Sequence, residues 1–216
     1  MLIENWMTKD VVTATPETSM MKASKIMKEK NVSRLPVVDD KGVLVGIVSD
    51  RDVKDASPSK ATTLDMHELY YLLSEIKVKD IMTKKVVTIK TGETVDSAAA
   101  IMLEHKIGGM PVVDEQNKVV GIVTDSDIFK VLVRITGVLE GGVQIGVRLS
   151  NEPGGLVPVL DYLKDHGARL MSLLTACEPP EVGMRDVYLR IRDMDKTSMN
   201  ALKAEMQKSF EVIYWV

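Results

Sequence analysis

The sequence predicts a mixed α/β (α+β) fold in which one small unit is used twice and a different domain follows. The first observation is a repeat: residues 32–39 read VSRLPVVD and residues 107–114 read IGGMPVVD, at an offset of 75 residues. The same offset relates Met7 to Met82 and Gly46 to Gly121 without a gap. The second observation is a Gly-containing linker at 138–142, after which the sequence pattern changes. A repeat of this length indicates a subdomain used twice, not a turn of a short-period solenoid.

The size and composition are those of a soluble globular protein. The 216 residues are 45% hydrophobic and 27% charged, which is ordinary for one or two domains with a buried core. The formal net charge of −3 gives no electrostatic reason to expect nucleic acid or an acidic membrane as a partner.

The N-terminus and the cysteine content favour a cytoplasmic protein. Residues 1–6 lack the basic stretch and apolar run of a signal peptide, and no apolar run approaches the roughly 18 residues of a membrane span. The single cysteine, Cys177, excludes an internal disulfide and fits a reducing compartment.

The first repeat begins with a predicted strand and a helix. Residues 11–13 are a short β-branched run, typical of a strand or an extended arm. A helix is expected over about 18–30, and Asn31 ends it. Its apolar face consists of Met20, Ala23, Ile26 and Met27.

A hairpin and a second helix complete the repeat. Residues 35–38 and 43–48 are predicted strands, joined by a turn at 39–42 in which glycine supplies a positive φ. Ser49 and Asp52 are expected to cap the helix that follows, because their side chains can accept hydrogen bonds from free backbone N–H groups. The predicted order of the unit is therefore β-α-β-β-α.

The rest of the chain divides by the same signals. After residue 142 the predicted order is β-α-β-β-α-β, which is a ferredoxin-like layer of helices on a sheet. In the linker between repeats, an amphipathic helix presents Leu69, Leu72, Leu73 and Ile76. The predicted parts are repeat 1 over 1–57, a linker helix over 58–77, repeat 2 over 78–135, a linker over 136–142 and a third domain over 143–216.

Both repeats resemble cystathionine-β-synthase (CBS) domains, which pair in tandem to form one module. The residues that carry the resemblance run from Leu35-Pro36-Val37-Val38-Asp39 to Gly46-Ile47-Val48-Ser49-Asp50-Arg51-Asp52, and again from Met110-Pro111-Val112-Val113-Asp114 to Gly121-Ile122-Val123-Thr124-Asp125-Ser126-Asp127. The resemblance implies adenine-nucleotide sites between the repeats, for AMP, ADP or ATP, with S-adenosylmethionine as a further possible ligand.

The site residues follow from the matched positions. An acid at each helix start, Asp52 and Asp127, can accept both ribose hydroxyl hydrogens, while Ser49, Thr124 and helix N–H groups can hold a phosphate. The alternative for each Ser/Thr-x-x-Asp is a plain helix cap, and the two roles are compatible. The nucleotide-binding positions implied by the resemblance are Thr15, Ala23, Val32, Ser33, Arg34, Pro36, Ser49, Arg51 and Asp52, with Thr91, Ala98, Ile107, Gly108, Gly109, Pro111, Thr124 and Asp127. The apolar members among them are equally credible as core residues.

The two copies differ in their cations. In the family a basic residue at the position of Arg34 often reaches phosphate, and the alternative is a solvated surface arginine. The second copy has Gly109 there, which removes a phosphate anchor or leaves room for a close backbone approach. Arg51 can supplement Arg34, whereas Ser126 has no charge, so the two sites are not expected to be used equally.

The third domain is similar to ACT domains, which are small-molecule-sensing ferredoxin-like folds that usually pair. Residues 151–156, NEPGGL, stand against a family preference for Asp-x-Pro-Gly-x-Leu. The candidate ligand residues are Asn151, Gly154, Gly155 and Leu156, and a simple β–α turn is the alternative. Asn151 in place of Asp weakens capture of an amino group. A CBS pair followed by an ACT-like domain resembles the acetoin-utilisation regulatory proteins of the B type.

No catalytic or metal site is predicted. His67, His105 and His166 stand singly, without ligands at metal spacing, and Cys177 has no histidine nearby in sequence. We therefore expect a non-enzymatic sensor without an obligatory cofactor that forms a homodimer and regulates a partner enzyme. The alternative is a ligand-free scaffold that dimerises and docks on a metabolic enzyme. A third hypothesis, an enzyme of acetoin or nucleotide metabolism, lacks a catalytic constellation.

Overall fold

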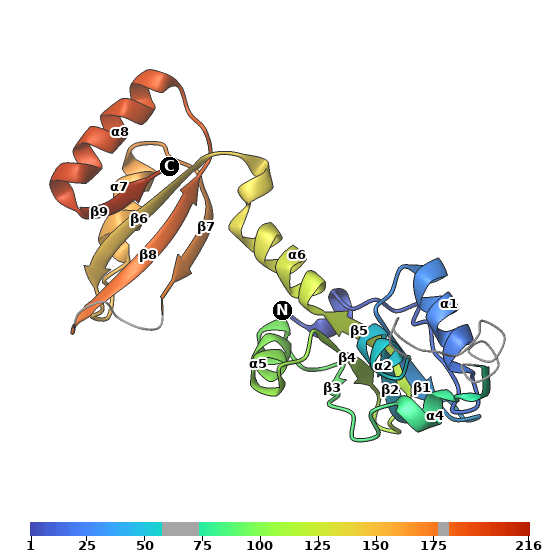
Figure 1. The fold of residues 1–216 in the computed structure, drawn as a ribbon. Helices are drawn as coiled ribbons and strands as arrows, with labels where there is room; N and C mark the ends of the chain where they lie inside the picture. The colour runs from blue at the N-terminus through green and yellow to red at the C-terminus, as the bar shows by residue number, and fades with distance from the viewer. Residues whose placement is uncertain (58–73, 177–181) are drawn as a thin grey trace. The chain divides into compact units, whose positions relative to one another are not determined.

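The computed structural model describes residues 1–57, 74–176 and 182–216 (Figure 1). The chain forms two compact units, Met1–Ile128 and Phe129–Val216. Most of the predicted linker helix, including Leu69, Leu72 and Leu73, lies outside the described residues, as does Cys177. Among the described residues, no helix is long and apolar enough to cross a membrane.

The first unit contains both repeats in the predicted order. Its elements are η1 (Ile3–Asn5), α1 (Met20–Lys30), β1 (Arg34–Val38), β2 (Leu44–Ser49), α2 (Asp50–Asp55), α4 (Val78–Ile81), β3 (Ile89–Lys90), α5 (Val95–His105), β4 (Gly109–Val113) and β5 (Val119–Thr124). Helix α6 (Asp125–Thr136) begins in this unit and ends in the second.

Local signals set the bounds of α1. The Ser19 side chain accepts a hydrogen bond from the Lys22 amide and caps the first turn. The helix ends at Asn31, as predicted, because Asn31 adopts the left-handed conformation at φ 52°. Met20, Ala23 and Met27 are buried, so the predicted apolar face is the one that packs.

The two hairpins have matching registers. Arg34 pairs with Ser49 in the first and Gly109 with Thr124 in the second, and the registers shift after Val37 and after Val112. The repeat is therefore preserved in the backbone as well as in the sequence.

Residues 11–13 do not form a strand of the sheet, so of the two alternatives, a strand or an extended arm, the strand is not observed; the equivalent residues 86–88 behave in the same way. Neither run pairs with a sheet; the residue after each does. Ala14 makes a single parallel bridge to Val37, and strand β3 begins at Ile89, which pairs with Val112. In the first repeat, pairing with the sheet begins only at Ala14. The Ala14 amide donates to the Pro36 carbonyl, and the Ala14 carbonyl accepts from the Val38 amide, both at 2.9 Å.

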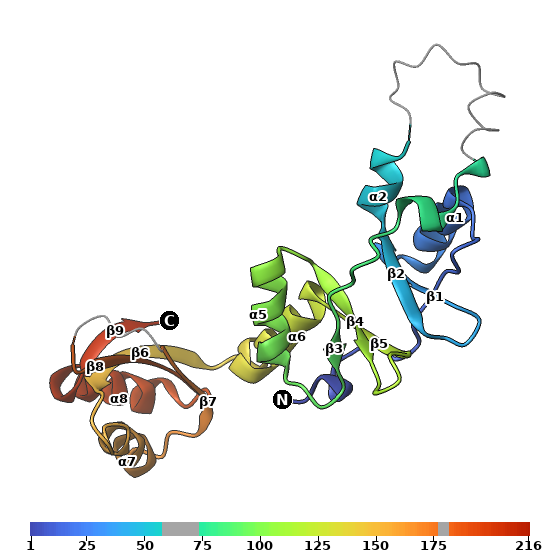
Figure 2. The same cartoon turned by 90° about the horizontal axis from the view of Figure 1, so that it is seen from below.

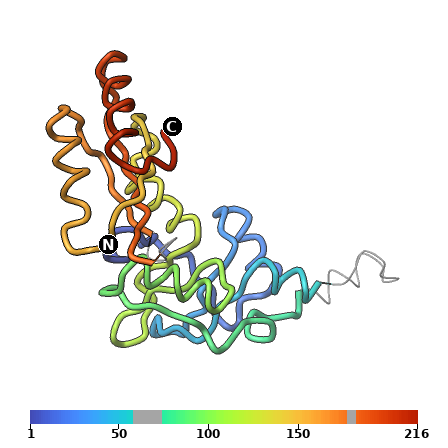
Figure 3. Tube along the Cα trace, turned by 90° about the vertical axis from the view of Figure 1, so that its left-hand side faces the viewer, coloured from blue at the N-terminus to red at the C-terminus, as the bar shows by residue number. Residues whose placement is uncertain are grey.

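The repeats exchange their lead-in segments. The Ile3 amide donates to Glu93 O at 2.9 Å, and Thr8 bonds with Ile122 in both directions. Equivalently, Val78 N donates to Thr18 O at 2.8 Å, and Thr83 bonds with Ile47 in both directions. In Figure 2, α4 lies beside α1 of the first repeat, and in Figure 3 the dark-blue start of the chain lies among the green segments of the second repeat.

Methionine–glycine contacts fix both exchanged segments. A Cβ atom on Gly121 would overlap the Met7 side chain, and one on Gly46 would overlap that of Met82. Ile3 and Val78, which are related by the repeat offset, are each fully buried. Each repeat is therefore completed by residues from the beginning of the other.

The second unit is a four-stranded antiparallel sheet with two helices on one face (Figure 2). Its elements after α6 are η2 (Val138–Glu140), β6 (Val143–Ser150), α7 (Val157–Asp165), β7 (Leu170–Thr175), β8 (Met184–Ile191), α8 (Lys196–Ser209) and β9 (Glu211–Trp215). The strand order is β7-β8-β6-β9, and the β-α-β-β-α-β order matches the prediction. Its core is formed by Ile145, Val147, Val159, Leu163, Val187, Leu189, Ile191, Leu202 and Met206.

Candidate functional site

Ser49 and Asp52 form a capping box at the start of α2. Asp52 Oδ2 accepts hydrogen bonds from the amide and the hydroxyl of Ser49, both at 2.7 Å, and the Ser49 hydroxyl accepts from the Asp52 amide. Both bonds from Ser49 end on Oδ2, and no described residue donates a hydrogen bond to Asp52 Oδ1, so this half of the carboxylate remains available to a ligand. The cap and the ligand role are therefore compatible.

Thr124 and Asp127 repeat this geometry at the start of α6. Asp127 Oδ2 accepts from the Thr124 amide at 3.0 Å and from the Thr124 hydroxyl at 2.8 Å. The two acids differ in accessibility, because Asp127 is only 6% exposed whereas Asp52 is half-buried.

The helix amides are less available for phosphate than the sequence suggests. The Asp50 amide donates to Ser33 O at 2.9 Å, and the Asp125 amide donates to Gly108 O at 3.2 Å. The Asp52 amide already donates to Ser49. Phosphate contacts at α2 must therefore come mainly from side chains.

A cleft of about 440 Å³ lies beside the Ser49–Asp52 cap, between the repeats of the first unit. Its volume is in the usual range of small-molecule sites, roughly 300–1,000 Å³. The predicted residues that line it are Arg34, Ser49, Arg51, Asp52, Ile107, Gly108 and Gly109. The structure thus brings together residues from both repeats around one of the two acids.

Sequence reasoning missed eight further lining residues. These are Ile47, Asp50, Thr83, Lys85, Val86, Val87, His105 and Lys106. Thr83, Lys85, Val86 and Val87 follow the exchanged segment of the second repeat, so they lie far from Asp52 in sequence. The repeat itself was the signal that could have pointed to these residues. The offset of 75 residues relates Thr83 to Thr8, so the segments that precede both repeats could have been considered together.

Arg34 crosses from one repeat to the other. Its Nη1 donates to the Gly108 carbonyl at 2.6 Å, and a Cβ atom on Gly109 would overlap the same nitrogen. Gly109 therefore leaves room for a close approach, but the group that occupies this room is the Arg34 side chain and not the backbone that was expected. Arg34 is accordingly half-buried in the cleft wall and is not a solvated surface arginine.

The other predicted positions lie apart from this cleft. Val32 and Ser33 line a smaller cavity of about 250 Å³ with Met27 and Lys28. Thr15 is exposed and its amide donates to the Thr18 hydroxyl, and Thr91 is half-buried. Ala23, Pro36, Ala98 and Pro111 are buried.

A second candidate pocket lies in the second unit, at the β6–α7 turn. Its volume is about 440 Å³, and the four predicted residues Asn151, Gly154, Gly155 and Leu156 all line it, together with Arg185. Gly155 is required there, because a Cβ atom would overlap the Ser150 carbonyl oxygen. Arg185 was not predicted; it supplies the positive charge in the lining.

The described residues contain no group of three or more His, Cys, Asp or Glu side chains that could hold a metal ion. His105 lines the first cleft and His166 contacts Glu205, while His67 lies outside the described residues.

Several proteins of known structure resemble this chain. The CBS domain pair of protein MJ0100, solved in complex with 5′-methylthioadenosine and S-adenosyl-L-methionine, is 34% identical with a TM-score of 0.52; the alignment covers 61% of this chain and 95% of that one. CBSX2, solved in complex with AMP, is 32% identical with a TM-score of 0.52 over 62% of this chain and 97% of that one. A putative acetoin utilization protein (AcuB) from Vibrio cholerae is 28% identical with a TM-score of 0.54 over 65% and 96%.

Curated relatives include enzymes that carry the same module. L-aspartate semialdehyde sulfurtransferase of Methanocaldococcus jannaschii is 36% identical over 127 residues, which is 59% of this chain but only 22% of that protein. The match therefore covers about a fifth of the enzyme.

The CBS domain family matches residues 3–59 and 78–134, which are the two repeats described above. The mixed α/β fold agrees with that match, and the chain belongs to the family of proteins built on a tandem pair of CBS domains.

Proposed function

We propose that this protein is a regulatory sensor that binds an adenine nucleotide in the cleft between its two CBS repeats. The observation that carries the proposal is the cleft itself, which combines a half-exposed carboxylate with apolar and cationic walls. Solved relatives bound to AMP, 5′-methylthioadenosine and S-adenosylmethionine support an adenosine-containing ligand.

Each part of an adenine nucleotide has a partner in the cleft. Asp52 Oδ1 can accept hydrogen bonds from the ribose hydroxyls, since Oδ2 is already held by Ser49. Ile107, Val86 and Val87 offer an apolar wall for the adenine. Thr124 and Asp127, which repeat the geometry of Ser49 and Asp52, are proposed as a second binding position that is not used equally with the first.

Ligand binding changes the protein only if two arrangements of the repeats bind with unequal affinity. Because the lead-in segments cross between repeats, a ligand that contacts both Asp52 and residues 105–109 is well placed to bias such an equilibrium. We further propose that the second unit is an ACT-like domain that receives this signal or binds a second small ligand at residues 151–156.

The proposed role in the cell is based on the similar proteins described above. A homodimer in the cytoplasm, without catalytic activity of its own, would regulate a partner enzyme. The likeness to an acetoin utilization protein supports a role of the B-type acetoin regulators, and a CBS module also occurs inside the sulfurtransferase relative.

Isothermal titration calorimetry with AMP, ADP, ATP and S-adenosylmethionine tests the proposal. We expect binding by the wild-type chain, and Asp52→Ala should weaken it by roughly tenfold or more, since hydrogen bonds to a charged group are worth about 1.5–3 kcal/mol. Asp127→Ala tests the second position in the same way. If no ligand gives heat or a thermal shift at millimolar concentration, the alternative of a ligand-free scaffold is favoured.

A further inference from the structure

The two pseudo-equivalent sites of the CBS pair differ in charge. The 75-residue offset relates Arg51, Lys85 and Lys106 of the cleft beside Asp52 to Ser126, Asp10 and Asn31. Three cations on one side thus correspond to two neutral residues and one acid on the other. His105 corresponds to Lys30, so the second position gains one positive charge at this pair of residues.

Within the described part of the chain, three cations of the cleft have no anionic partner. Among the described residues, none of Arg51, Lys85 and Lys106 takes part in an ion pair. The two acids in the cleft wall are engaged elsewhere, because Asp50 pairs with Lys54 at 3.2 Å and Asp52 accepts from Ser49. Like charges gathered in one cleft repel one another, so an anionic ligand is favoured there.

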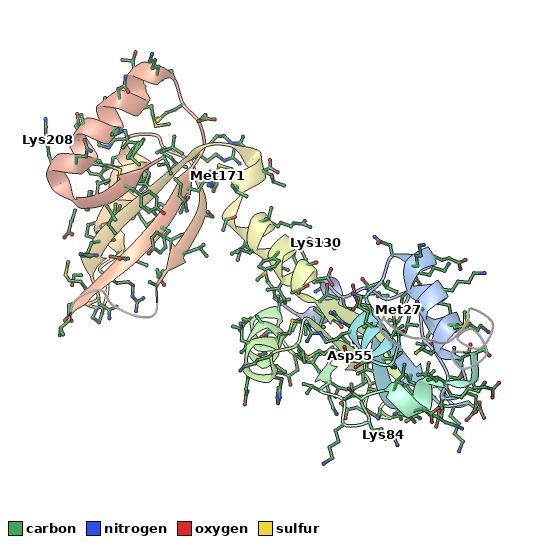
Figure 4. The ribbon with its side chains drawn as sticks, in the orientation of Figure 1. Met27, Asp55, Lys84, Lys130, Met171 and Lys208 are labelled. Atoms are coloured by element: carbon green, nitrogen blue, oxygen red, sulfur yellow. The ribbon has the colours of Figure 1, made fainter. Side chains whose placement is uncertain are left out.

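Arg34 adds a fourth cation from a fixed position. It lines the same cleft, and its hydrogen bond to Gly108 O holds the guanidinium in place. The repeat offset relates Arg34 to Gly109, and both residues line this cleft, so Arg34 is common to the two positions and the charge difference between them comes from Arg51, Lys85 and Lys106. By contrast Lys84, adjacent to Lys85, does not line the cleft and extends away from the module (Figure 4).

We infer that the cleft beside Asp52 selects adenosine with a chain of two or three phosphates. The position beside Asp127 takes an adenosine derivative with less negative charge. The inference rests on the proposed function and specifies which ligand class goes to which site. The phosphates lie against Arg51, Lys85 and Lys106, where cations form charge-assisted hydrogen bonds with phosphate oxygens.

The experiment compares dissociation constants for adenosine, AMP, ADP and ATP, measured by calorimetry on the full chain without divalent cations. We expect affinity to rise from adenosine to ATP, with one tight ATP site per chain. Arg51→Ser and Lys85→Asp each introduce the residue that the other repeat has at the equivalent position. Each should lower the ratio of ATP affinity to adenosine affinity by roughly tenfold. The ratio is taken within each variant, so a general loss of affinity cancels.

Matched controls come from the other repeat and from the surface. Asp10→Lys with Ser126→Arg should leave the tight ATP site unchanged and create a second site with phosphate preference, and Lys84→Asp should change the ratio less than threefold. The inference is overturned if adenosine and ATP bind equally to the wild type, or if Lys85→Asp lowers the ratio no more than Lys84→Asp. Failure of every adenosine ligand to bind would instead overturn the proposed function. If Lys85→Asp does not fold, Lys85→Gln, a milder change at an exposed residue, replaces it in the same comparison with Lys84→Asp.

Discussion

Single residues explain why the two repeats of the first unit are not interchangeable. Gly109 has no side chain because Arg34 of the other repeat lies over it, and the guanidinium bonds the neighbouring carbonyl of Gly108 at 2.6 Å. A glycine in one copy is thus explained by an arginine in the other.

Gly109→Ala should lower the free energy of unfolding by about 1–3 kcal/mol, because the added methyl group displaces Arg34 and approaches the Val123 carbonyl. Urea denaturation monitored by circular dichroism measures this. The control is Gly92→Ala, since nothing lies within 4 Å of a Cβ atom there. In the Arg34→Ala background the cost should shrink; an unchanged cost would show that the backbone contact, not Arg34, makes glycine necessary.

His166 provides a pH-dependent contact in the second unit. Its Nδ1 lies 2.8 Å from Tyr162 O and its Nε2 lies 2.9 Å from Glu205 Oε2. The backbone hydrogen bond to Tyr162, followed by the one to Glu205, raises the pKa of His166 above its usual 6.5. Its contribution to stability is therefore fully present below about pH 6.5 and is lost as the pH rises through the folded-state pKa.

The stability of the wild type should fall between pH 6 and pH 8 by more than that of His166→Gln. Urea unfolding across this range, with an NMR titration of the imidazole, measures the difference. Glu205→Gln should bring the His166 pKa closer to its usual value, because it removes the carboxylate partner. A His166 pKa at or below 6.5 in the wild type would contradict the assignment.

At the scale of elements, helix ends and caps, which depend on neighbouring residues, were predicted well from the sequence. Pairing between distant segments was not predicted. The end of α1 at Asn31 and the cap formed by Ser49 and Asp52 were predicted because each depends on residues within one helical turn. Lys85 was missed as a cleft residue because it follows the exchanged lead-in segment, and the exchange leaves no local pattern in the sequence. The choice at 11–13 between a strand and an extended arm stayed open for a related reason, since the hydrogen bonds of Ala14 with Pro36 and Val38 decide where pairing begins.

The exchange predicts a crossed effect of core substitutions. Ile3→Ala should cost about 2–5 kcal/mol, because Ile3 is fully buried. The loss of hydrogen-exchange protection should concentrate in residues 93–95 and 121–122 of the second repeat, where its segment bonds.

Val78→Ala is the mirror control. It should expose amides near Met20 and Ile47 in the first repeat instead, because the segment that contains Val78 bonds there. Equal loss of protection in both repeats for each variant would contradict the crossed arrangement.

At the scale of the molecule, the chain forms two compact units with separate cores, and the boundary in sequence falls within α6. The Asp52 cleft is lined wholly by the first unit, and the pocket at residues 151–156 wholly by the second. A ligand of one cleft therefore stabilises directly only the core that forms it.

Calorimetric unfolding should show one transition that shifts with ATP and one that does not. At a free ligand concentration 100 times the dissociation constant, the first unit gains about 2.7 kcal/mol. Asp52→Ala should abolish most of the shift without moving the other transition. A joint shift of both transitions would show that the two units unfold together, and coupling between them would then be measurable from its size.

The crossed lead-in segments also bear on how such a protein can arise. In a chain that ended after a single repeat, the first eight residues would lack the Gly121 strand that receives Met7, and the strand with Gly46 would lack the methionine that it receives. Two such chains would each lend that arm to the other, giving a symmetric, arm-swapped pair. Fusion of two copies of the gene, one after the other, would give the repeat offset of 75 residues seen in this sequence. Each repeat could then change its charged residues independently of the other.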